Sequence, residues 1–121
     1  MIERIPDLPS NVLGFEAKGT VTGSDYESII IPAVEEAFKS QRRIRFLYHL
    51  GPQFTGFETA ALWDDAKLGM THLSGWERIA VVTDKPWVKA TVGAFAIVIP
   101  SKVRVFAENE LGAARAWLSE T

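Results

Sequence analysis

One short apolar segment near the middle of the chain limits its possible folds more than any other feature. Residues 79–83, IAVVT, are almost wholly apolar, are rich in β-branched side chains and are followed by the polar Asp84. This pattern is typical of a central strand in a parallel sheet, because helices cover both faces of such a strand. Pro86 then stands where proline is favoured, in the first turn of a new helix. The segment therefore predicts an α/β fold.

Hydrophobic patterns on both sides of this segment predict strands and helices in alternating order. We expect strands at 2–5, 13–17, 44–50, 79–83 and 103–106, and helices at 24–40, 57–73, 87–99 and 109–118. The short connection between the first two strands predicts an antiparallel hairpin, and GPQFTG at 51–56 predicts a loop. The chain of 121 residues is expected to form one domain, 1–121. Its architecture would be a mixed, mostly parallel sheet of four to five strands with about four helices.

Local signals give details of three of these helices. Ser24 and Glu27 have the spacing of a capping box, and Asn109 is the expected cap of the last helix. Pro32 should bend or restart the first helix, as a hinge or as a tolerated kink. The second helix is expected to bury one stripe, with Trp63 to one side of it: Leu62, Ala66, Gly69, Met70 and Leu73.

Composition excludes several classes of function. A formal net charge of −2 argues against general binding of nucleic acid, and the absence of cysteine excludes disulfides, thiol catalysis and cysteine-based zinc sites. The N-terminal MIERIPDL lacks the apolar core of a signal peptide, and no stretch approaches the roughly 20 apolar residues of a membrane span. These features predict a cytoplasmic protein of bacterial type.

The helix expected at 87–99 has apolar side chains on every side. A core stripe of Val88, Val92, Phe95 and Ile99 is accompanied on the other sides by Ala90, Ala94, Ile97 and Val98. Such a helix must be covered all round, and a small domain can hardly cover it alone. Three covers are conceivable: a second copy in a homodimer, an apolar ligand, or lipid.

Large apolar side chains make the ligand alternative concrete. Trp63 and Met70 on the helix at 57–73, with Trp87 and Phe95 on the helix at 87–99, could line an apolar pocket between the two helices. Ordinary packing in a core or an interface is the other interpretation of the tryptophans.

Polar residues give little support for catalysis. Asp64 and Asp65 are adjacent, so on a helix they diverge by about 100° and cannot share a metal or a proton well. Asp84 follows a parallel strand, where α/β folds place ligands, but it could equally cap the next helix. A metal site formed by Asp65, His72 and His49 has little support. We find no nucleophile elbow, phosphate loop or dinucleotide fingerprint, and predict no cofactor, no metal and no enzymatic activity.

Four segments in their order along the chain resemble the SpoIIAA-like family. They are FTGFETAALWDDAKLG at 54–69, IAVVTDKPW at 79–87, VRVF at 103–106 and AARAWL at 113–118. The family consists of small bacterial proteins with a STAS-like, CRAL-TRIO-like α/β fold. The resemblance implies a dimer, here through the helix at 87–99, and binding of an apolar or lipid-like molecule.

The same resemblance implies an alternative role as a regulatory domain that acts through a protein partner. STAS anti-sigma antagonists carry a phosphorylatable serine at the start of the helix that follows the third strand. The corresponding region here offers Thr55 and Thr59 as phosphorylation sites and lacks the Asp-Ser pattern. We therefore expect a non-enzymatic small-molecule-binding module, with the regulatory domain as the alternative.

Overall fold

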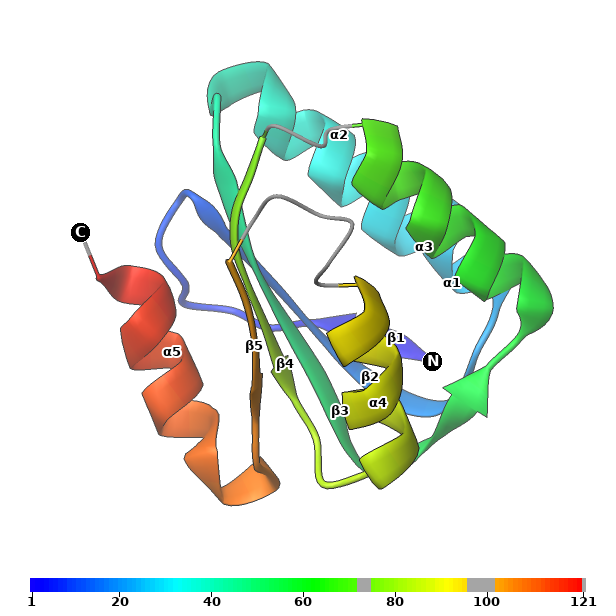
Figure 1. Cartoon of the computed structure of the whole chain (residues 1–121). Coiled ribbons are helices and arrows are strands. Elements are labelled where there is room, and N and C mark those ends of the chain that lie inside the picture. Colours follow the sequence, from blue (N-terminus) through cyan, green and yellow to red (C-terminus); the bar gives the residue numbers. More distant parts are fainter. Residues whose placement is uncertain (72–74, 96–101, 121) are drawn as a thin grey trace.

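The computed structural model describes residues 1–71, 75–95 and 102–120, which form a five-stranded sheet with helices on both faces (Figure 1). The spatial order β1-β2-β3-β4-β5 equals the chain order; β1 pairs antiparallel with β2, and all other neighbours pair in parallel. The strands are β1 Ile2–Arg4, β2 Val12–Val21, β3 Ile44–Phe57, β4 Trp76–Val82 and β5 Lys102–Phe106. The helices are α1 Gly23–Asp25, η1 Tyr26–Ile30, α2 Ile31–Ser40, α3 Thr59–Thr71, α4 Pro86–Phe95, η2 Glu108–Glu110 and α5 Leu111–Ser119. The predicted mixed α/β fold is confirmed.

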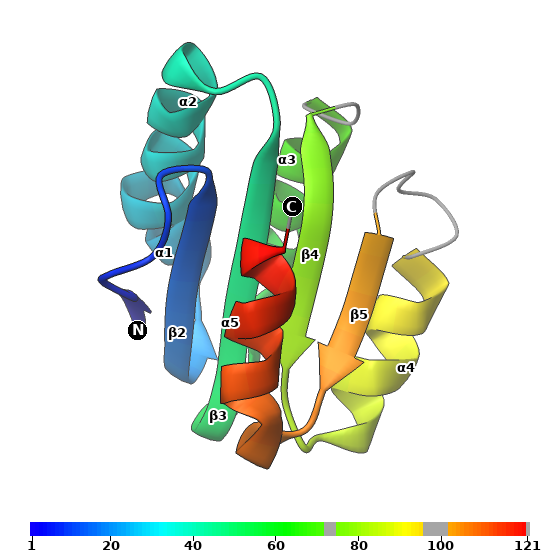
Figure 2. The same cartoon turned by 90° about the vertical axis from the view of Figure 1, so that its left-hand side faces the viewer.

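The helices are divided unequally between the two faces of the sheet. α5 lies alone on one face, and α1 to α4 lie on the other (Figures 1 and 2). The reason is the strand order: each parallel strand is followed by its spatial neighbour, and right-handed connections then place every crossover helix on the same face. Only the helix after the last strand is free to cover the opposite face.

Each face has its own hydrophobic core. The larger core joins the sheet to α1 to α4 and is rich in aromatic side chains, which include Phe15, Phe46 and Trp76. The smaller core lies under α5, where Phe106, Trp117 and Leu118 pack with Leu47 of β3. Successive residues of β3 alternate between the two cores, as expected for a strand that is buried on both faces.

The predicted loop at 51–56 is wrong, because β3 continues to Phe57. β2 is longer than expected too, and its last residues pair with this extension: Gly19 with Phe54 and Val21 with Phe57. The register shifts on both sides of Gly19, whose φ of +63° is available to glycine at little cost. Gly51 and Gly56, which suggested a loop, therefore lie within β3, opposite the part of β2 where the register shifts.

The first helical segment begins earlier than expected. Thr22, not Ser24, is the N-cap: its hydroxyl accepts from the Asp25 amide at 3.1 Å, and the Asp25 carboxylate accepts from the Thr22 amide at 2.9 Å. Residues 26–30 form a π-helix, in which the Ile31 amide donates to the Tyr26 carbonyl, and α2 restarts with Pro32 in its first turn. The expected restart at this proline is confirmed.

Helix α3 turns a different side to the core than its apolar stripe predicts. Ala61, Asp64 and Leu68 are buried, whereas Leu62 is 47% exposed. The prediction that Leu62 faces the core is therefore wrong. α3 consequently brings a carboxylate inward and leaves a leucine on the surface, which is the reverse of ordinary amphipathic packing.

The later elements follow the prediction with smaller changes. α4 begins at Pro86 as expected and is described to Phe95, so residues 96–99 of the predicted helix lie outside the described part. Asn109 does not cap α5; it lies within η2, where the Glu110 carboxylate accepts from the Ala107 amide at 2.7 Å. In the described segments, no helix has the length and apolar character needed to cross a membrane.

Arg45 ties the C-terminal end of α5 to the sheet. This side chain lies in β3 and is almost fully buried; its Nε donates to Glu77 Oε1 at 2.6 Å. Its guanidinium also donates to the carbonyl of Leu118 at 2.8 Å and to that of Glu120. The hydrogen bond from Arg45 lowers the pKa of Glu77, and desolvation opposes this effect only in part. One buried guanidinium thus joins β3, β4 and α5.

We predict that Arg45→Met lowers the free energy of unfolding by about 1–3 kcal/mol, because it leaves buried acceptors without a donor. Arg43→Met is the matched control: Arg43 approaches the same carboxylate at 3.7 Å but is largely exposed, so its loss should change stability by less than about 0.5 kcal/mol. Urea unfolding at neutral pH measures both.

The interaction of Arg45 with Glu77 also predicts a pH dependence. Because the pKa of Glu77 is lowered in the folded state, its contribution to the free energy of unfolding is present above the ordinary carboxyl pKa and is lost as the pH falls. The effect of Arg45→Met should therefore shrink in acid, and a constant difference would contradict this account.

Candidate functional site

Two tyrosines and an aspartate form a chain of hydrogen bonds between the sheet and two helices. The Tyr26 hydroxyl of η1 donates to Oδ1 of Asp65 on α3 at 2.7 Å. It also lies 3.0 Å from the Tyr48 hydroxyl of β3. Since the Tyr26 proton is directed to Asp65, Tyr48 is the donor in the second bond. In these three groups, called here the Tyr–Tyr–Asp chain, both tyrosines therefore direct their protons toward Asp65, which accepts.

Burial changes the titration of all three groups. Desolvation is the main reason that the pKa values of Tyr26 and Tyr48 are raised, and the charge of Asp65 adds to the effect on both. Desolvation also raises the pKa of Asp65, while the hydrogen bond from Tyr26 opposes this rise. Both phenols therefore stay protonated at neutral pH, and Asp65 is the acceptor at the end of the chain.

An aromatic floor continues from this chain to helix α4. We use this name for Tyr48, Phe54 and Phe57, all on β3. The ring centroids of Tyr48 and Phe57 are 6.2 Å apart, and Trp87 of α4 stacks on Phe54 at 5.8 Å with an interplanar angle of 26°. Trp87 also meets Phe57 edge to face at 6.5 Å. Rings in these arrangements attract one another through their quadrupoles, so the floor links Asp65 to Trp87 across the end of β3.

The two aspartates of α3 point in directions roughly 100° apart and meet different neighbours. Asp64 faces α1, and its Oδ2 lies 3.7 Å from the position that a Cβ on Gly23 would occupy. Asp65 accepts from Tyr26 of η1, and Leu62 lies one turn before it on the same helix. Trp63 lies on the outer side of the helix and is 68% exposed. Asp65 and Leu62 are therefore an exposed carboxylate and an exposed leucine one turn apart.

Asp65 lies at the protein surface, whereas the Tyr26 side chain that donates to it is buried. Desolvation by neighbouring protein atoms raises the pKa of the Asp65 carboxyl group. The rings of Tyr48 and Phe54 are buried as well, so Leu62, Asp65 and Trp87 are the exposed members of this region. The candidate site consists of Leu62 and Asp65 of α3, Tyr26, the aromatic floor and Trp87.

The structure divides the residues that the sequence assigns to ligand binding. Trp87 lies on the aromatic floor and is 47% exposed, so it belongs to the candidate site. Trp63 points to the outside of α3 and has no described contact with this floor. Met70 and Phe95 belong to α3 and α4, but their side chains lie outside the described part of the chain.

Sequence reasoning missed Tyr26, Tyr48 and Leu62 as site residues. Tyr26 has the helical spacing of a buried stripe, and Tyr48 lies in a strand with apolar side chains on both faces, so the sequence indicates a core role for each. One sequence feature could have pointed to these residues. Asp64 and Asp65 diverge on the helix, so each carboxylate must meet a different neighbour.

The two candidate phosphorylation sites have different surroundings. Thr55 lies in β3, and its hydroxyl is 3.1 Å from that of Thr20 on β2. Thr59 is exposed and is the first residue of α3, directly after Glu58, whose carbonyl accepts the first hydrogen bonds of the helix. Only Thr59 therefore occupies the start of the helix that follows β3.

A second polar cluster lies on the α5 face, around His49 of β3. Its ring nitrogens are 2.7 Å from Glu108 and 3.3 Å from Glu16. The Asp84 carboxylate does not cap α4; it accepts from the Glu108 amide at 2.9 Å and fixes the connection from β5 to α5. Within the described ranges, no group of three or more His, Asp or Glu side chains is arranged to hold a metal ion. The cluster joins neighbouring structural elements.

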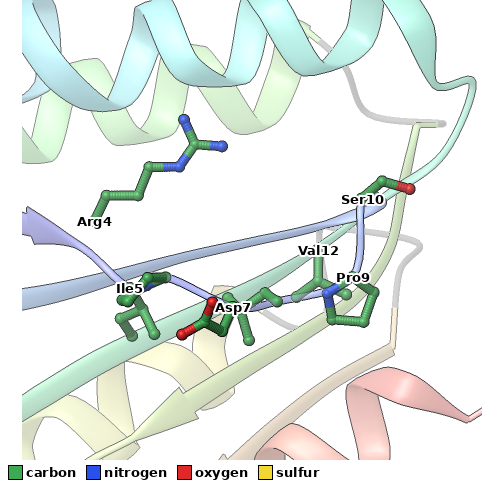
Figure 3. A pocket seen from close by; sticks show the side chains of 8 residues that line it. Arg4, Ile5, Asp7, Pro9, Ser10 and Val12 are labelled. Atoms are coloured by element: carbon green, nitrogen blue, oxygen red, sulfur yellow. The ribbon is translucent and has the colours of Figure 1, made fainter.

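A pocket of about 320 Å³ lies under the N-terminal loop (Figure 3). Residues between β1 and the start of β2 line it: Arg4, Ile5, Pro6, Asp7, Leu8, Pro9, Ser10 and Val12. In Figure 3 the guanidinium of Arg4 and the carboxylate of Asp7 point in opposite directions. Ligand sites bring a few polar groups together on an apolar wall, and this pocket does not.

The fold and the site define a small α/β domain with one face of crossover helices, in which two buried tyrosines lead to an exposed carboxylate. The chain belongs to the SpoIIAA-like family, whose model matches residues 12–119. It is similar to the crystal structure of an uncharacterised DUF3478 protein with a SpoIIAA-like fold from Shewanella loihica PV-4. That similarity has a TM-score of 0.80 and 25% identity over 97% of this chain and 93% of that chain. No curated protein matches the sequence.

We predict that Asp65→Asn changes the pH dependence of stability. The raised pKa of Asp65, above its ordinary 3.8, means that the native state binds this proton more tightly than the unfolded chain does. The contribution of Asp65 to the free energy of unfolding is therefore complete below about pH 4. It is lost as the pH rises through the pKa that Asp65 has in the folded state. Asparagine does not titrate, so the variant should gain stability relative to the wild type between pH 4 and neutrality.

Urea unfolding across this pH range tests the prediction. Tyr26→Phe is the comparison variant, because removing the bond that lowers the pKa of Asp65 should make the loss of stability with rising pH larger. Parallel pH profiles for the wild type and Asp65→Asn would contradict an elevated pKa.

Proposed function

We propose that this protein is a non-enzymatic module that binds a small apolar or lipid-like molecule between α3 and α4. The observation that carries the proposal is the exposed apolar surface on these two helices, which includes Leu62 and Trp87. Apolar and aromatic side chains with a few polar groups beside them, here Asp65, are the kind of surface that binds apolar molecules. The proposal places such a module in the bacterial cytoplasm.

The exposure of these two apolar side chains supports the proposal. Leu62 of α3 and Trp87 of α4 are each 47% exposed. Burial of these two side chains by a ligand would gain roughly 25 cal/mol per Å² of apolar surface. Trp87 is also held in place by Phe54 and Phe57, so it loses little conformational freedom when a ligand packs on it.

A second copy of the chain is the competing cover for α4. A homodimer through the predicted helix 87–99 would bury Trp87 and the exposed Ala90 in the same way. The two accounts differ in one measurable respect: a dimer depends on protein concentration, whereas binding of a ligand by a monomer depends on the concentration of that ligand.

We predict that Trp87→Ala weakens binding of dodecanol about tenfold or more, because truncation of a tryptophan in a desolvated contact commonly costs 2 kcal/mol or more. Trp63→Ala should leave binding unchanged, since its side chain lies on the outer side of α3. Isothermal titration calorimetry with dodecanol measures both affinities. Sedimentation equilibrium at two protein concentrations separates ligand binding from dimerisation. Absence of dodecanol binding to the wild type, or an equal loss in both variants, would refute a binding site at Trp87.

The alternative function is a STAS-type regulatory domain with a protein partner. Its supporting observation is Thr59, an exposed hydroxyl at the first position of α3. A phosphoryl group there would meet the free amide groups and the positive end of the helix dipole. Thr55 lacks this environment because it lies within a strand.

The regulatory alternative predicts that Thr59, and not Thr55, is phosphorylated in the cell. Intact mass measurement of the native protein should show one phosphoryl group that Thr59→Ala removes and Thr55→Ala retains. Thr59→Glu should alter retention of a partner protein in pull-down, with Thr55→Glu as its control. If the native protein is unmodified and neither glutamate variant changes its partners, the alternative is refuted.

A further inference from the structure

Strand β5 forms one margin of the sheet and has an open edge. It pairs with β4 on one side, and within the described ranges no strand lies along its other side. The Thr83 amide donates to the Phe106 carbonyl at 2.9 Å, so the backbone of Phe106 is directed toward the end of β4. Because these directions alternate along a strand, the amide and carbonyl groups of Val103 and Val105 are directed away from β4. Such an edge can pair with a further strand.

Arg104 is an exposed residue in the middle of this edge strand. Its guanidinium lies over the rings of Phe106 and Trp117, at 4.8 and 5.2 Å from their centroids. Both rings are buried, whereas Arg104 itself is exposed. Figure 2 shows that α5 covers β3 and β4 and leaves β5 beside it. The aromatic contacts therefore hold a cation at the uncovered margin of the sheet.

No neighbouring acid balances the charge of Arg104. Arg78 of β4 also lies over Trp117, at 5.3 Å, but its guanidinium approaches the Glu120 carboxylate at 3.9 Å. Among the residues that the structure describes, no carboxylate forms an ion pair with Arg104. A guanidinium with one face on aromatic rings still has N–H donors along its edges, and these match a carboxylate. β5 therefore offers backbone groups and a positioned positive charge together.

We propose that β5 binds an extended acidic segment of another protein, which adds a strand to the sheet and places a glutamate or aspartate beside Arg104. Hydrogen bonds with the backbone of Val103 and Val105 supply affinity in this mode of binding, and the ion pair supplies specificity. A second copy of the chain fits this edge less well. In a two-fold pairing centred on β5, the Arg104 side chains of the two copies lie opposite each other, and like charges in that position are destabilising.

Two hexapeptides of opposite charge test the choice of partner: acetyl-TEVEVT-amide and acetyl-TKVKVT-amide. Isothermal titration calorimetry at low salt should show that the acidic peptide binds about tenfold or more tightly, because like charges across an interface are costly. Added salt should reduce this difference. The acidic peptide should also slow hydrogen exchange at the amides of Val103 and Val105. Exchange at Arg104 and Phe106 should change little, because their amides are directed toward β4.

Methylation of the peptide backbone tests the pairing itself. One acidic peptide carries N-methyl groups on its two glutamates, and another carries them on its two valines. Since alternate residues of a strand direct their amides to opposite sides, only one of these sets faces β5. One methylated peptide should lose binding and the other should retain it.

Arg104→Glu tests the charge. The variant should lose the preference for the acidic peptide and bind the basic peptide more tightly. Arg42→Glu is the matched control: it changes the net charge equally at an exposed position between α2 and β3, and it should keep the wild-type preference. Thermal unfolding checks that both variants are folded, and the peptide comparisons with the wild type remain valid if Arg104→Glu is not.

Several results would overturn the proposal. They are absence of binding by the acidic peptide, equal binding of the two charges, equal effects of the two methylations, or an unchanged preference in folded Arg104→Glu. Sedimentation equilibrium identifies the competing occupant: a dimer with protected Val103 and Val105 amides would assign the edge to a second copy of the chain and would also refute the acidic partner.

Discussion

The handedness of parallel strand connections determines the arrangement of the rest of this molecule. β2, β3, β4 and β5 lie side by side in chain order and all run in the same direction. A right-handed crossover between such neighbours always falls on the same side of the sheet. Three successive crossovers therefore crowd α1 to α4 onto one face, and the opposite face depends on α5 and the N-terminal loop. The contacts of Arg45 with Glu77 and the C-terminal carbonyls hold that single helix in place.

Crowding on the crossover face explains the unusual orientation of α3. The close approach of α1 to α3 is possible because Gly23 has no side chain: a Cβ there would lie 2.8 Å from Ala60. α3 rests against α1 through Ala60 and Asp64, and its second aspartate accepts from the Tyr26 hydroxyl. Tyr26 is the first residue of the π-helix that precedes α2. Leu62 is then left at the surface, beside the carboxylate.

Single-sequence patterns identified this fold because its strongest signals are local. The apolar segment 79–83 required a strand covered on both faces, and Pro86 marked the start of the next helix. The same reasoning failed where two elements compete for one position. The glycines at 51 and 56 indicate a loop in isolation, but the last residues of β2 pair with Phe54, Gly56 and Phe57 in the extension of β3. Asn109 is a good cap in isolation, yet the bond from the Glu108 amide to Asp84 places it inside η2.

The candidate site shows the same division between local and tertiary information. Trp87 could be identified from the sequence, because a large apolar residue at the start of an apolar helix needs a cover. Tyr26, Tyr48 and Asp65 could not be grouped, since they are far apart in the chain and each has a plausible separate role. Their hydrogen bonds exist only when η1, β3 and α3 are packed together.

The sequence by itself determined the class of fold, the order of its elements and the excess of apolar surface on the crossover helices. These properties follow from hydrophobic period and from proline and glycine, which act within a few residues. Only the tertiary structure decided which side of α3 faces the core and that Asp65 ends a chain of buried hydroxyl groups. Rotation of a helix about its axis depends on the side chains of its neighbours, and no pattern within the helix itself contains that information.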